Sequence, residues 1–258
     1  MSDILTEVDD LGIATITLNR PEKRNAVKVA MWAELGRLFR EFGDDPTIRV
    51  IILTGAGGYF SAGADISEFS TNDSEESTSV TSEDVGDVCT RSILDAPKPT
   101  IAAIEGFCVG GGLGLAVSCD FRVAKRGARF GIPAARLGIV YGWLDTQALM
   151  DVVGVAGAKR ILFTAQQFDS EAAHRLGLID ELTDQDALAA ARELAQTIAR
   201  NAPLSVGGAK QIVRGLAAGD PRVRVLSSEL GDQAMASDDY KEGVRAFGEK
   251  RVAKFTGH

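Results

Sequence analysis

Two glycine-rich turns are the segments of this chain best suited to chemistry. They follow Ile48–Leu53 and Thr100–Ile104, two apolar runs typical of strands buried on both faces. The first turn leads through Gly55–Gly58 into Phe60–Ile66, and the second contains Gly110-Gly111-Gly112 before an apolar helix. N–H groups at a helix start lack partners within the helix, so two such turns facing one point would form a two-donor oxyanion hole. Alternatively, the glycines only allow close packing of helix on strand.

Other motifs for phosphate binding or nucleophilic catalysis are missing from the sequence. The dinucleotide pattern G-x-G-x-x-G fails because Leu115 stands where the third glycine is needed, and neither a P-loop nor G-x-S-x-G occurs. His174 falls in a predicted amphipathic helix, and His258 is the last residue. A serine or cysteine nucleophile would therefore lack a base, and Cys108 is expected to be a small buried apolar residue.

The composition is that of a globular protein. The chain has 258 residues, 45% hydrophobic and 25% charged, which excludes disorder, collagen and coiled coil as descriptions of the whole. With a net charge of −8 and no dense block of Lys or Arg, we expect neither nucleic acid nor a membrane as partner. No apolar run reaches about 18 residues and the N-terminus is acidic, so we expect no membrane span and no signal peptide.

The cysteine content favours a reducing compartment. Cys89, Cys108 and Cys119 have no C-x-x-C spacing, which indicates free thiols and argues against a zinc site. Free thiols are typical of a reducing compartment, and we expect a cytoplasmic protein without a bound metal.

The residue pattern predicts one α/β domain over residues 1–258, with a core to about residue 200 and helices over about 201–258. Ile4–Val8 and Ile13–Leu18 are predicted to form a hairpin. The apolar residues within 28–42 have helical spacing. After Phe121–Ala124 the pattern becomes helical, and Thr183-Asp184-Gln185-Asp186 predicts a capping box. Further helices are predicted over about 203–217, 221–236 and 239–250.

One acidic stretch separates the two glycine turns. Ser67–Asp87 contains nine Ser or Thr and seven Asp or Glu, with no Lys or Arg. Such a stretch buries little apolar surface, so we predict a mobile, solvated segment at the mouth of a pocket.

Short motifs in order along nearly the whole chain resemble the crotonase (enoyl-CoA hydratase/isomerase) superfamily. They are Asn19-Arg20-Pro21, Asn25-Ala26, Phe60–Ile66, Lys98–Gly106, Gly110-Gly111-Gly112, Cys119-Asp120, Phe130-Gly131 with Pro133, Ala173, Gly177-Leu178-Ile179, Asp239–Gly243 and Phe247–Arg251. Each motif alone is weak, but their combination and order are specific.

The resemblance implies a crotonase-like ββα superhelix with a C-terminal helical trimerisation region, assembled as a homotrimer or a dimer of trimers. The ligand would be an acyl-CoA thioester, with CoA as part of the substrate and no separate cofactor. The oxyanion hole would consist of the N–H groups of Ala64 and Gly111. Further substrate contacts would come from Arg24, Ala26, Ala62, Asp65, Ile66, Gly110, Ala134 and Leu137.

The sequence departs from the hydratases at both of their glutamates. These stand two residues after the glycine triple and directly after the proline of F-G-x-P, where this chain has Gly114 and Ala134. A general acid or base is typically worth about 10²–10⁴ in rate, so we expect very slow crotonyl-CoA hydration.

Tyr141 and Asp145 are the candidates to replace these glutamates. Tyr141 could donate a hydrogen bond, and Asp145 could act as a base if burial raises its pKa. Alternatively, Asp145 caps a helix beginning at Thr146, and Tyr141 only packs. Glu68 is a weaker candidate that we expect to be solvated. Asp65 is expected to cap its own helix or to contact CoA.

Tyr141 also looks similar to a tyrosine in the same loop of methylmalonyl-CoA decarboxylase. That reaction needs little acid–base equipment, but the decarboxylase has a histidine at the position of Ala64. We favour an acyl-CoA lyase or isomerase. A decarboxylase of a malonyl-type CoA ester, a catalytically silent acyl-CoA binder and a purely structural protein remain alternatives.

Overall fold

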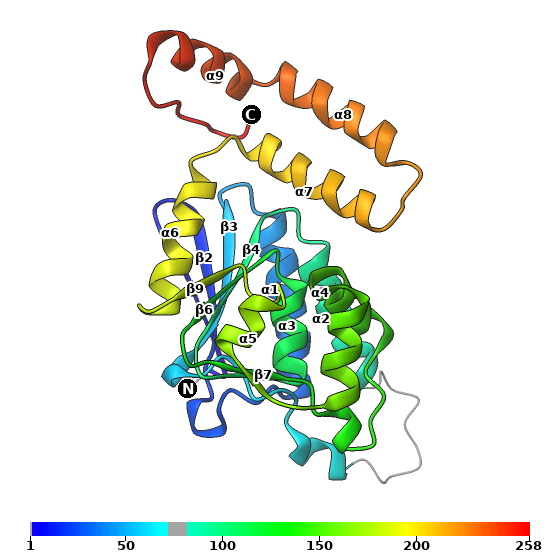
Figure 1. Ribbon diagram of the computed structural model, residues 1–258. Coiled ribbons are helices and arrows are strands. Elements are labelled where there is room, and N and C mark those ends of the chain that lie inside the picture. Colours follow the sequence, from blue (N-terminus) through cyan, green and yellow to red (C-terminus); the bar gives the residue numbers. More distant parts are fainter. Residues whose placement is uncertain (1, 72–81) are drawn as a thin grey trace.

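A six-stranded sheet forms the centre of the molecule (Figure 1). The computed structural model describes residues 2–71 and 82–258. β1 pairs with β2 in antiparallel fashion, and the other neighbouring strands pair in parallel. In spatial order the strands are β1 (Ile4–Val8), β2 (Ile13–Leu18), β3 (Val50–Gly55), β4 (Thr100–Ile104), β6 (Phe121–Lys125) and β9 (Glu181–Thr183).

A smaller sheet continues the chain beyond the end of β4. It consists of β5 (Phe107–Val109), β7 (Arg129–Gly131) and β8 (Phe168–Asp169). Gly106 makes the turn between β4 and β5 at φ +55°, and a Cβ atom there would lie 2.3 Å from the Gly58 carbonyl oxygen. Only glycine fits this position. β5 leads directly into the second glycine turn.

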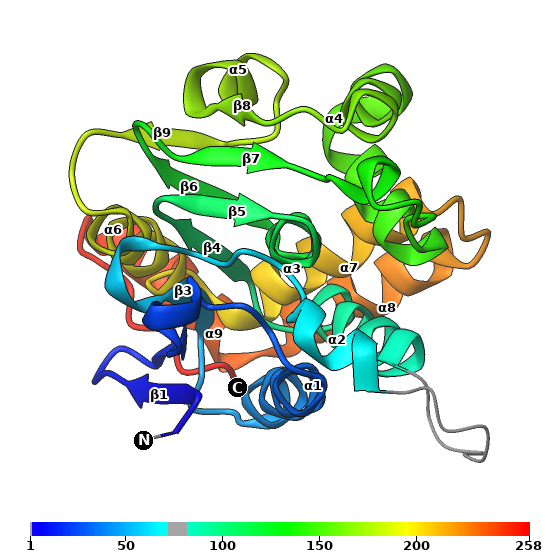
Figure 2. The ribbon, with the colours of Figure 1, turned by 90° about the horizontal axis from the view of Figure 1, so that it is seen from below.

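Alternation along the central strands directs side chains to two helical layers. Ile51 and Leu53 lie in the core against the helices on one face, whereas Val50 and Ile52 pack with alanines of α6 on the other. The first layer is α1 (Val29–Asp44), α2 (Ser82–Leu94) and α3 (Gly111–Ser118), and the second is α6 (Ala187–Ala199). Figure 2 shows α3 among the helices of its layer, in contact with α2 and with α4 (Trp143–Thr164).

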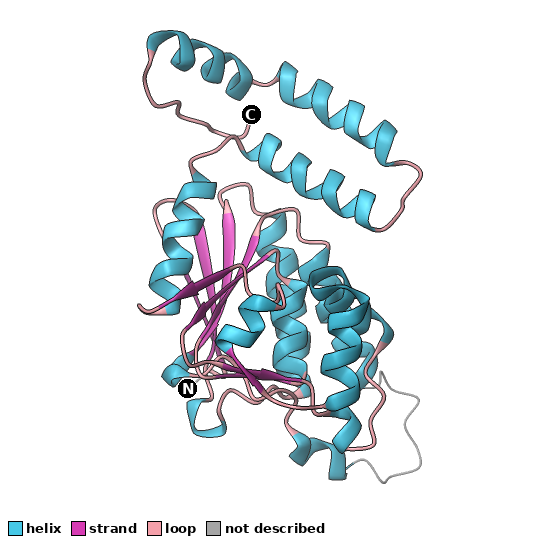
Figure 3. Ribbon diagram, in the orientation of Figure 1, coloured by secondary structure: helices cyan, strands magenta, loops and turns pink. Residues whose placement is uncertain are grey.

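Three helices project beyond one end of the sheet (Figures 1 and 3). They are α7 (Pro203–Ala217), α8 (Val223–Ala236) and α9 (Asp238–Glu249). The short α5 (Ser170–Arg175) contacts β7, β8 and β9. Lys210 of α7 forms an ion pair with Asp120 at 2.7 Å, which ties the projecting helices to the sheet. These three helices expose large apolar side chains: Val213, Leu216, Val225, Met235, Val244 and Phe247.

The predicted hairpin, the strand at β4 and the C-terminal helices are confirmed. After Phe121–Ala124 the chain is mostly helical, as predicted, but the pattern missed β7, β8 and β9, which are two or three residues long and too short to show alternation. The predicted capping box is wrong. Asp186 is the N-cap of α6 and accepts a hydrogen bond from Ala189 N at 2.8 Å, while Thr183 ends β9.

The acidic stretch is described only at its two ends. Residues 72–81 of the predicted mobile segment lie outside the described residues. Its described ends are helical, as η3 (Ile66–Thr71) and the first turns of α2. The low apolar content did not predict these helices. Short 3₁₀ helices also occur as η1 (Pro21–Lys23), η2 (Ala56–Gly58) and η4 (Ala134–Arg136).

All three cysteines are free, as their spacing predicted, and all three are buried. Burial raises the pKa of the Cys119 thiol to about 12 and also raises the pKa values of Cys89 and Cys108. These thiols are therefore protonated at neutral pH. Across residues 2–71 and 82–258, no helix combines the length and apolarity needed to cross a bilayer.

Candidate active site

The two glycine turns predicted to carry chemistry meet in the structure. Gly63 has a φ of +96°, and a Cβ atom on it would lie 2.7 Å from the Val109 carbonyl oxygen and 3.1 Å from Gly111 N. A Cβ atom on Gly111 would lie 3.5 Å from Ala64 N. Any side chain at position 63 would separate the turns, so glycine there keeps the backbone N–H groups of Ala64 and Gly111 close together.

Both of these N–H groups lack a described acceptor. Val27 N donates to Gly63 O at 2.8 Å and Asp65 N donates to Val27 O at 2.9 Å, so Ala64, between them, directs its own N–H away from Val27. Gly111 is the first residue of α3, where an N–H has no partner within the helix.

The prediction that both donors stand at helix starts is therefore half right. The Gly111 donor opens α3, whereas the Ala64 donor belongs to an extended segment, because η3 begins only at Ile66. An extended strand alternates its N–H directions, so the bridge to Val27 orients the Ala64 N–H without a helix.

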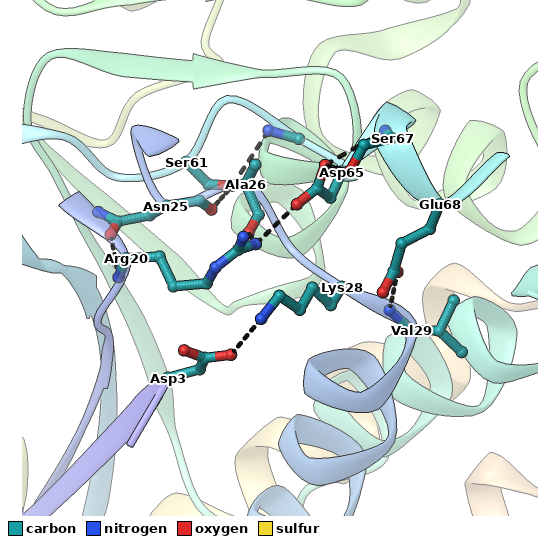
Figure 4. A network of polar contacts seen from close by, with 11 residues as sticks. Asp3, Arg20, Asn25, Ala26, Lys28, Val29, Ser61, Asp65, Ser67 and Glu68 are labelled. Atoms are coloured by element: carbon teal, nitrogen blue, oxygen red, sulfur yellow. Dashed lines mark hydrogen bonds and ion pairs between the residues drawn. The ribbon is translucent and has the colours of Figure 1, made fainter. Parts of the chain in front are cut away.

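Ser61 and Asn25 fix the first turn, a role that no pattern in the sequence indicated. Ser61 N donates to Phe107 O at 2.8 Å, and Ser61 Oγ donates to Asn25 O at 2.8 Å (Figure 4). The Asn25 amide donates to the carbonyl oxygens of Ala56 and Tyr59. Both side chains are fully buried. They hold the segment that carries Ala64 against β5.

Asp65 is held by donors on both carboxylate oxygens (Figure 4). Oδ1 accepts from Ser67 Oγ at 2.7 Å and from Ser67 N at 3.3 Å, and Oδ2 pairs with Arg20 Nη1 at 2.9 Å. These hydrogen bonds, first from Ser67 and then from Arg20, hold the pKa of Asp65 below its usual value. The predicted capping role of Asp65 at the start of η3 is confirmed.

Glu68 is less exposed than expected. Its carboxylate was predicted to be solvated, but Glu68 is half-buried and its Oε2 accepts a hydrogen bond from Val29 N at 2.8 Å (Figure 4). Val29 is the first residue of α1, where N–H groups lack helical partners and favour a nearby negative charge. The contact therefore gives Glu68 a role in stabilising the start of α1 rather than in acid–base chemistry.

Tyr141 and Asp145, the two predicted replacement residues, lie where a side chain at position 114 would be. A Cβ atom on Gly114 would lie 2.9 Å from the Tyr141 hydroxyl oxygen and 3.6 Å from both Cγ and Oδ1 of Asp145. The hydroxyl of Tyr141 is buried and has no hydrogen-bond partner among the described residues. Tyr141 and Asp145 thus fill space that a longer side chain at position 114 would need.

Asp145 does not cap a helix. α4 begins at Trp143 with Gly142 as N-cap, so Asp145 lies inside the first turn rather than before Thr146. Its Oδ1 accepts a hydrogen bond from Thr90 Oγ1 of α2 at 2.9 Å. Burial raises the pKa of the Asp145 carboxyl group, and the Thr90 hydrogen bond only partly opposes this. Thr90, 55 residues away, carried no signal in the sequence.

The other predicted substrate contacts lie at the surface around the two turns. Arg24 is exposed with its guanidinium 5.0 Å from the centre of the Phe107 ring, and its carbonyl oxygen accepts from Ala62 N. Gly110 is the N-cap of α3, and Ala26 O accepts from Arg20 Nη1. The roles of these residues remain predictions.

Three more of the predicted contacts differ in exposure. Ile66 and Leu137 are exposed, at 67% and 59%. Ala134 opens η4 and is half-buried against the core. Ile66 and Leu137 each leave apolar surface exposed.

The half-buried ring of Trp32 lies against the second glycine turn. A Cβ atom on Gly111 would approach Trp32 Cζ2 to 3.0 Å. Trp32 therefore forms an apolar wall beside the Gly111 N–H.

This arrangement suits chemistry in which negative charge develops on one oxygen. Two converging N–H groups can stabilise an oxyanion, and a carboxyl group with a raised pKa can carry a proton. Within the described ranges, no cluster of three His, Cys, Asp or Glu side chains could bind a metal ion. The geometry thus provides two backbone donors and one candidate acid–base group.

Comparisons with known proteins show which family the chain resembles. Residues 9–258 match the model of the family described as Enoyl-CoA hydratase/isomerase. The chain is 37% identical over 242 residues to the short-chain-enoyl-CoA hydratase of Clostridium acetobutylicum, covering 93% of this chain and 92% of that protein. It is 36% identical over 248 residues to the (E)-benzylidenesuccinyl-CoA hydratase of Thauera aromatica, covering 95% and 96%.

A solved structure extends the likeness to three dimensions. The crystal structure of a protein from Hyphomonas neptunium, assigned to the same family, superimposes with a TM-score of 0.92 at 41% identity. The match covers 100% of this chain and 98% of that one. The predicted α/β fold of the crotonase type is therefore confirmed.

Proposed function

Because this chain belongs to the enoyl-CoA hydratase/isomerase family, we propose that it binds an acyl-CoA thioester and stabilises its enolate between the N–H groups of Ala64 and Gly111. The support is geometric: the two turns are in contact, and neither N–H group has a described acceptor. The thioester carbonyl oxygen is the group that gains charge when an enolate forms. Removing one such donor typically costs about 10²–10³ in rate.

We further propose that Asp145 transfers a proton on the acyl group. The ionised carboxylate takes a proton from the α-carbon of a β,γ-unsaturated thioester. The C–H electron pair forms the enolate C=C bond, and the carbonyl π pair moves onto the thioester oxygen. Return of that proton to a different carbon shifts the double bond, so the reaction is an isomerisation. A raised pKa suits a residue that must both accept and return a proton near neutral pH.

The observation that carries this proposal is the filled space beside Gly114. A chain that had only lost its chemistry would leave that space to water or to apolar packing. Instead, Tyr141 directs a buried hydroxyl and Asp145 a carboxyl group into it. Placing two polar groups in a confined space is costly without a compensating function. This favours an enzyme with relocated acid–base groups over a silent binder.

Gly111→Pro tests the proposal, because proline removes the N–H group and is tolerated as the first residue of a helix. Gly111→Ala is the matched control, since it places the same Cβ atom against Trp32 but keeps the N–H group. Turnover and calorimetric affinity are measured on a panel of enoyl-, malonyl- and hydroxyacyl-CoA esters. We expect turnover of at least one ester by the wild type and a loss of about 10²–10³ in Gly111→Pro beyond that in Gly111→Ala.

Equal losses in the two variants would contradict the oxyanion-hole assignment. If Gly111→Pro does not fold, Ala64→Pro removes the other donor. Tight binding without turnover of any ester would establish the silent binder. Turnover confined to malonyl-type esters, with release of CO₂, would establish the decarboxylase.

We also propose that the chain assembles as a homotrimer or a dimer of trimers through α7–α9. Phe247, exposed at 89%, and the neighbouring apolar side chains of these helices support this, because such surface is usually covered in an assembly. Sedimentation equilibrium is expected to give three or six times the 27.3 kDa chain mass. A monomer at micromolar concentration would contradict the proposal.

A further inference from the structure

Thr90 makes an unusual use of its hydroxyl group. A serine or threonine inside a helix commonly donates to the carbonyl oxygen four residues earlier, as Ser92 Oγ does to Val88 O at 2.7 Å on the same helix. Thr90 instead donates its single hydroxyl proton across the core to Asp145 Oδ1 of α4. Thr90 is 2% exposed and Asp145 is half-buried, so this hydrogen bond is partly shielded from water.

This hydrogen bond is the only one that a described residue donates to the Asp145 side chain. No described lysine, arginine or histidine forms an ion pair with Asp145. The other titratable groups facing it are Asp87 and Cys89 of α2 and Tyr141 of the preceding loop. α3, which also packs against α4, carries no charged side chain. The orientation of the carboxyl group therefore depends on Thr90.

Building on the proposed function, we propose that Thr90 is a positioning residue, whose hydroxyl holds Asp145 Oδ1 beside Gly114 and so aligns the carboxyl group for proton transfer to and from the acyl group. Rotation about the Cβ–Cγ bond of Asp145 is otherwise unrestrained by any described donor. A carboxyl group free to rotate spends little time in the orientation that proton transfer requires. α2 thus contributes to the reaction without contacting the substrate.

The test compares Thr90→Val with two controls. Thr90→Val keeps the shape of the side chain but removes the donor, whereas Thr90→Ser keeps the donor. Ser92→Ala removes a buried hydroxyl from the same helix without touching Asp145, and controls for general loosening of α2. The pH profiles of kcat and KM are measured on the ester that the wild type turns over fastest.

We expect Thr90→Val to lower kcat about tenfold or more, with KM little changed. Loss of a donor to the carboxylate also moves the acidic limb of the kcat profile to higher pH. Thr90→Ser should restore both the rate and the limb, and Ser92→Ala should leave the limb where it is in the wild type. A purely structural role of Thr90 would not move the limb.

Titration of the Asp145 carboxyl carbon by ¹³C NMR adds a readout that needs no turnover, with Asp145→Asn used to assign the signal. The pKa of Asp145 should rise in Thr90→Val and stay unchanged in Ser92→Ala. An unchanged kcat profile or an unchanged titration in Thr90→Val would overturn the role of Thr90. Absence of turnover by the wild type on every ester would instead overturn the proposed function on which that role rests.

Discussion

Asp65 directly precedes η3, Asp145 lies beside Gly114 of α3, and the two show different ways of placing a carboxylate in one protein. Asp65 receives two hydrogen bonds from Ser67 and an ion pair from Arg20, and its pKa is lowered. Asp145 receives one hydrogen bond, from Thr90, and its pKa is raised by burial. The first carboxylate is stabilised in its charged form, and the second is not.

The difference separates an anchor from a reactive group. Asp65 joins the segment before η3 to the loop that carries Arg20, and its charge contributes to that connection. Asp145 gains little from being charged at its site, as expected for a group that must gain and lose a proton. A carboxylate with few partners in a confined space indicates function more strongly than a carboxylate in a complete network.

The largest expected effect is the loss of turnover when Asp145 is substituted. Asp145→Asn keeps the acceptor for Thr90 but cannot carry the proton, so we expect turnover to fall by about 10²–10⁴. Tyr141→Phe removes only a hydroxyl and should cost less. Steady-state kinetics on the preferred ester and on crotonyl-CoA measure both, and we expect wild-type hydration of crotonyl-CoA to be slower than that of an ordinary hydratase by several orders of magnitude.

Two results would break the assignment to Asp145. Rapid crotonyl-CoA hydration by the wild type and both variants would mean that the acid–base groups lie elsewhere. Equal losses in Asp145→Asn and in the shape-preserving Thr146→Val, whose hydroxyl lies next along α4, would indicate a packing defect at this helix start.

A smaller effect on stability sharpens the comparison. Asp65→Asn removes a charged partner of Arg20, a loss worth about 1.5–3 kcal/mol, with each kcal/mol shifting Tm by about 2–4 °C at this chain length. We therefore expect Tm at pH 7 to fall by several degrees. Asp145→Asn removes a charge that burial disfavours, so its Tm should equal or exceed that of the wild type. Differential scanning calorimetry of both variants measures these changes in Tm.

The dependence on pH distinguishes the two sites further. The pKa of Asp65 is lower in the folded state, so its stabilising contribution is present above its unfolded pKa and is lost as pH falls through the folded value. The pKa of Asp145 is higher in the folded state, so its charge destabilises the fold above that value, and acidification relieves this. The Tm advantage of Asp145→Asn should therefore shrink on acidification, and an advantage independent of pH would contradict the raised pKa.

Local patterns predicted the elements and the backbone half of the site. Alternation and apolar runs identified the strands β1 to β4, and the glycines at 63 and 110–112 marked the turns that meet. A positive φ or a close backbone approach leaves a glycine in the sequence, so this half of the site is visible residue by residue. The short strands β5, β7, β8 and β9 were missed because an alternation of period two cannot be recognised over two or three residues.

The side-chain half of the site could be predicted only in part. Tyr141 and Asp145 were singled out by type and by their place in a loop, but their common approach to Gly114 depends on packing between α3 and α4. Thr90 was missed because its partner lies 55 residues away and a threonine in a helix has an ordinary use for its hydroxyl. Contacts across the core leave no local pattern to detect.

Because its three cysteines are buried, the native protein should react little with thiol-labelling reagents. Protonated, inaccessible thiols react slowly with maleimides and disulfide reagents, because the thiolate is the nucleophile. A single cysteine introduced on an exposed helix face can thus carry a fluorophore or spin label without removal of the natural residues. The same three thiols become reactive only where the core opens, so the rate at which they are labelled measures the opening of the helical layer around α2 and α3.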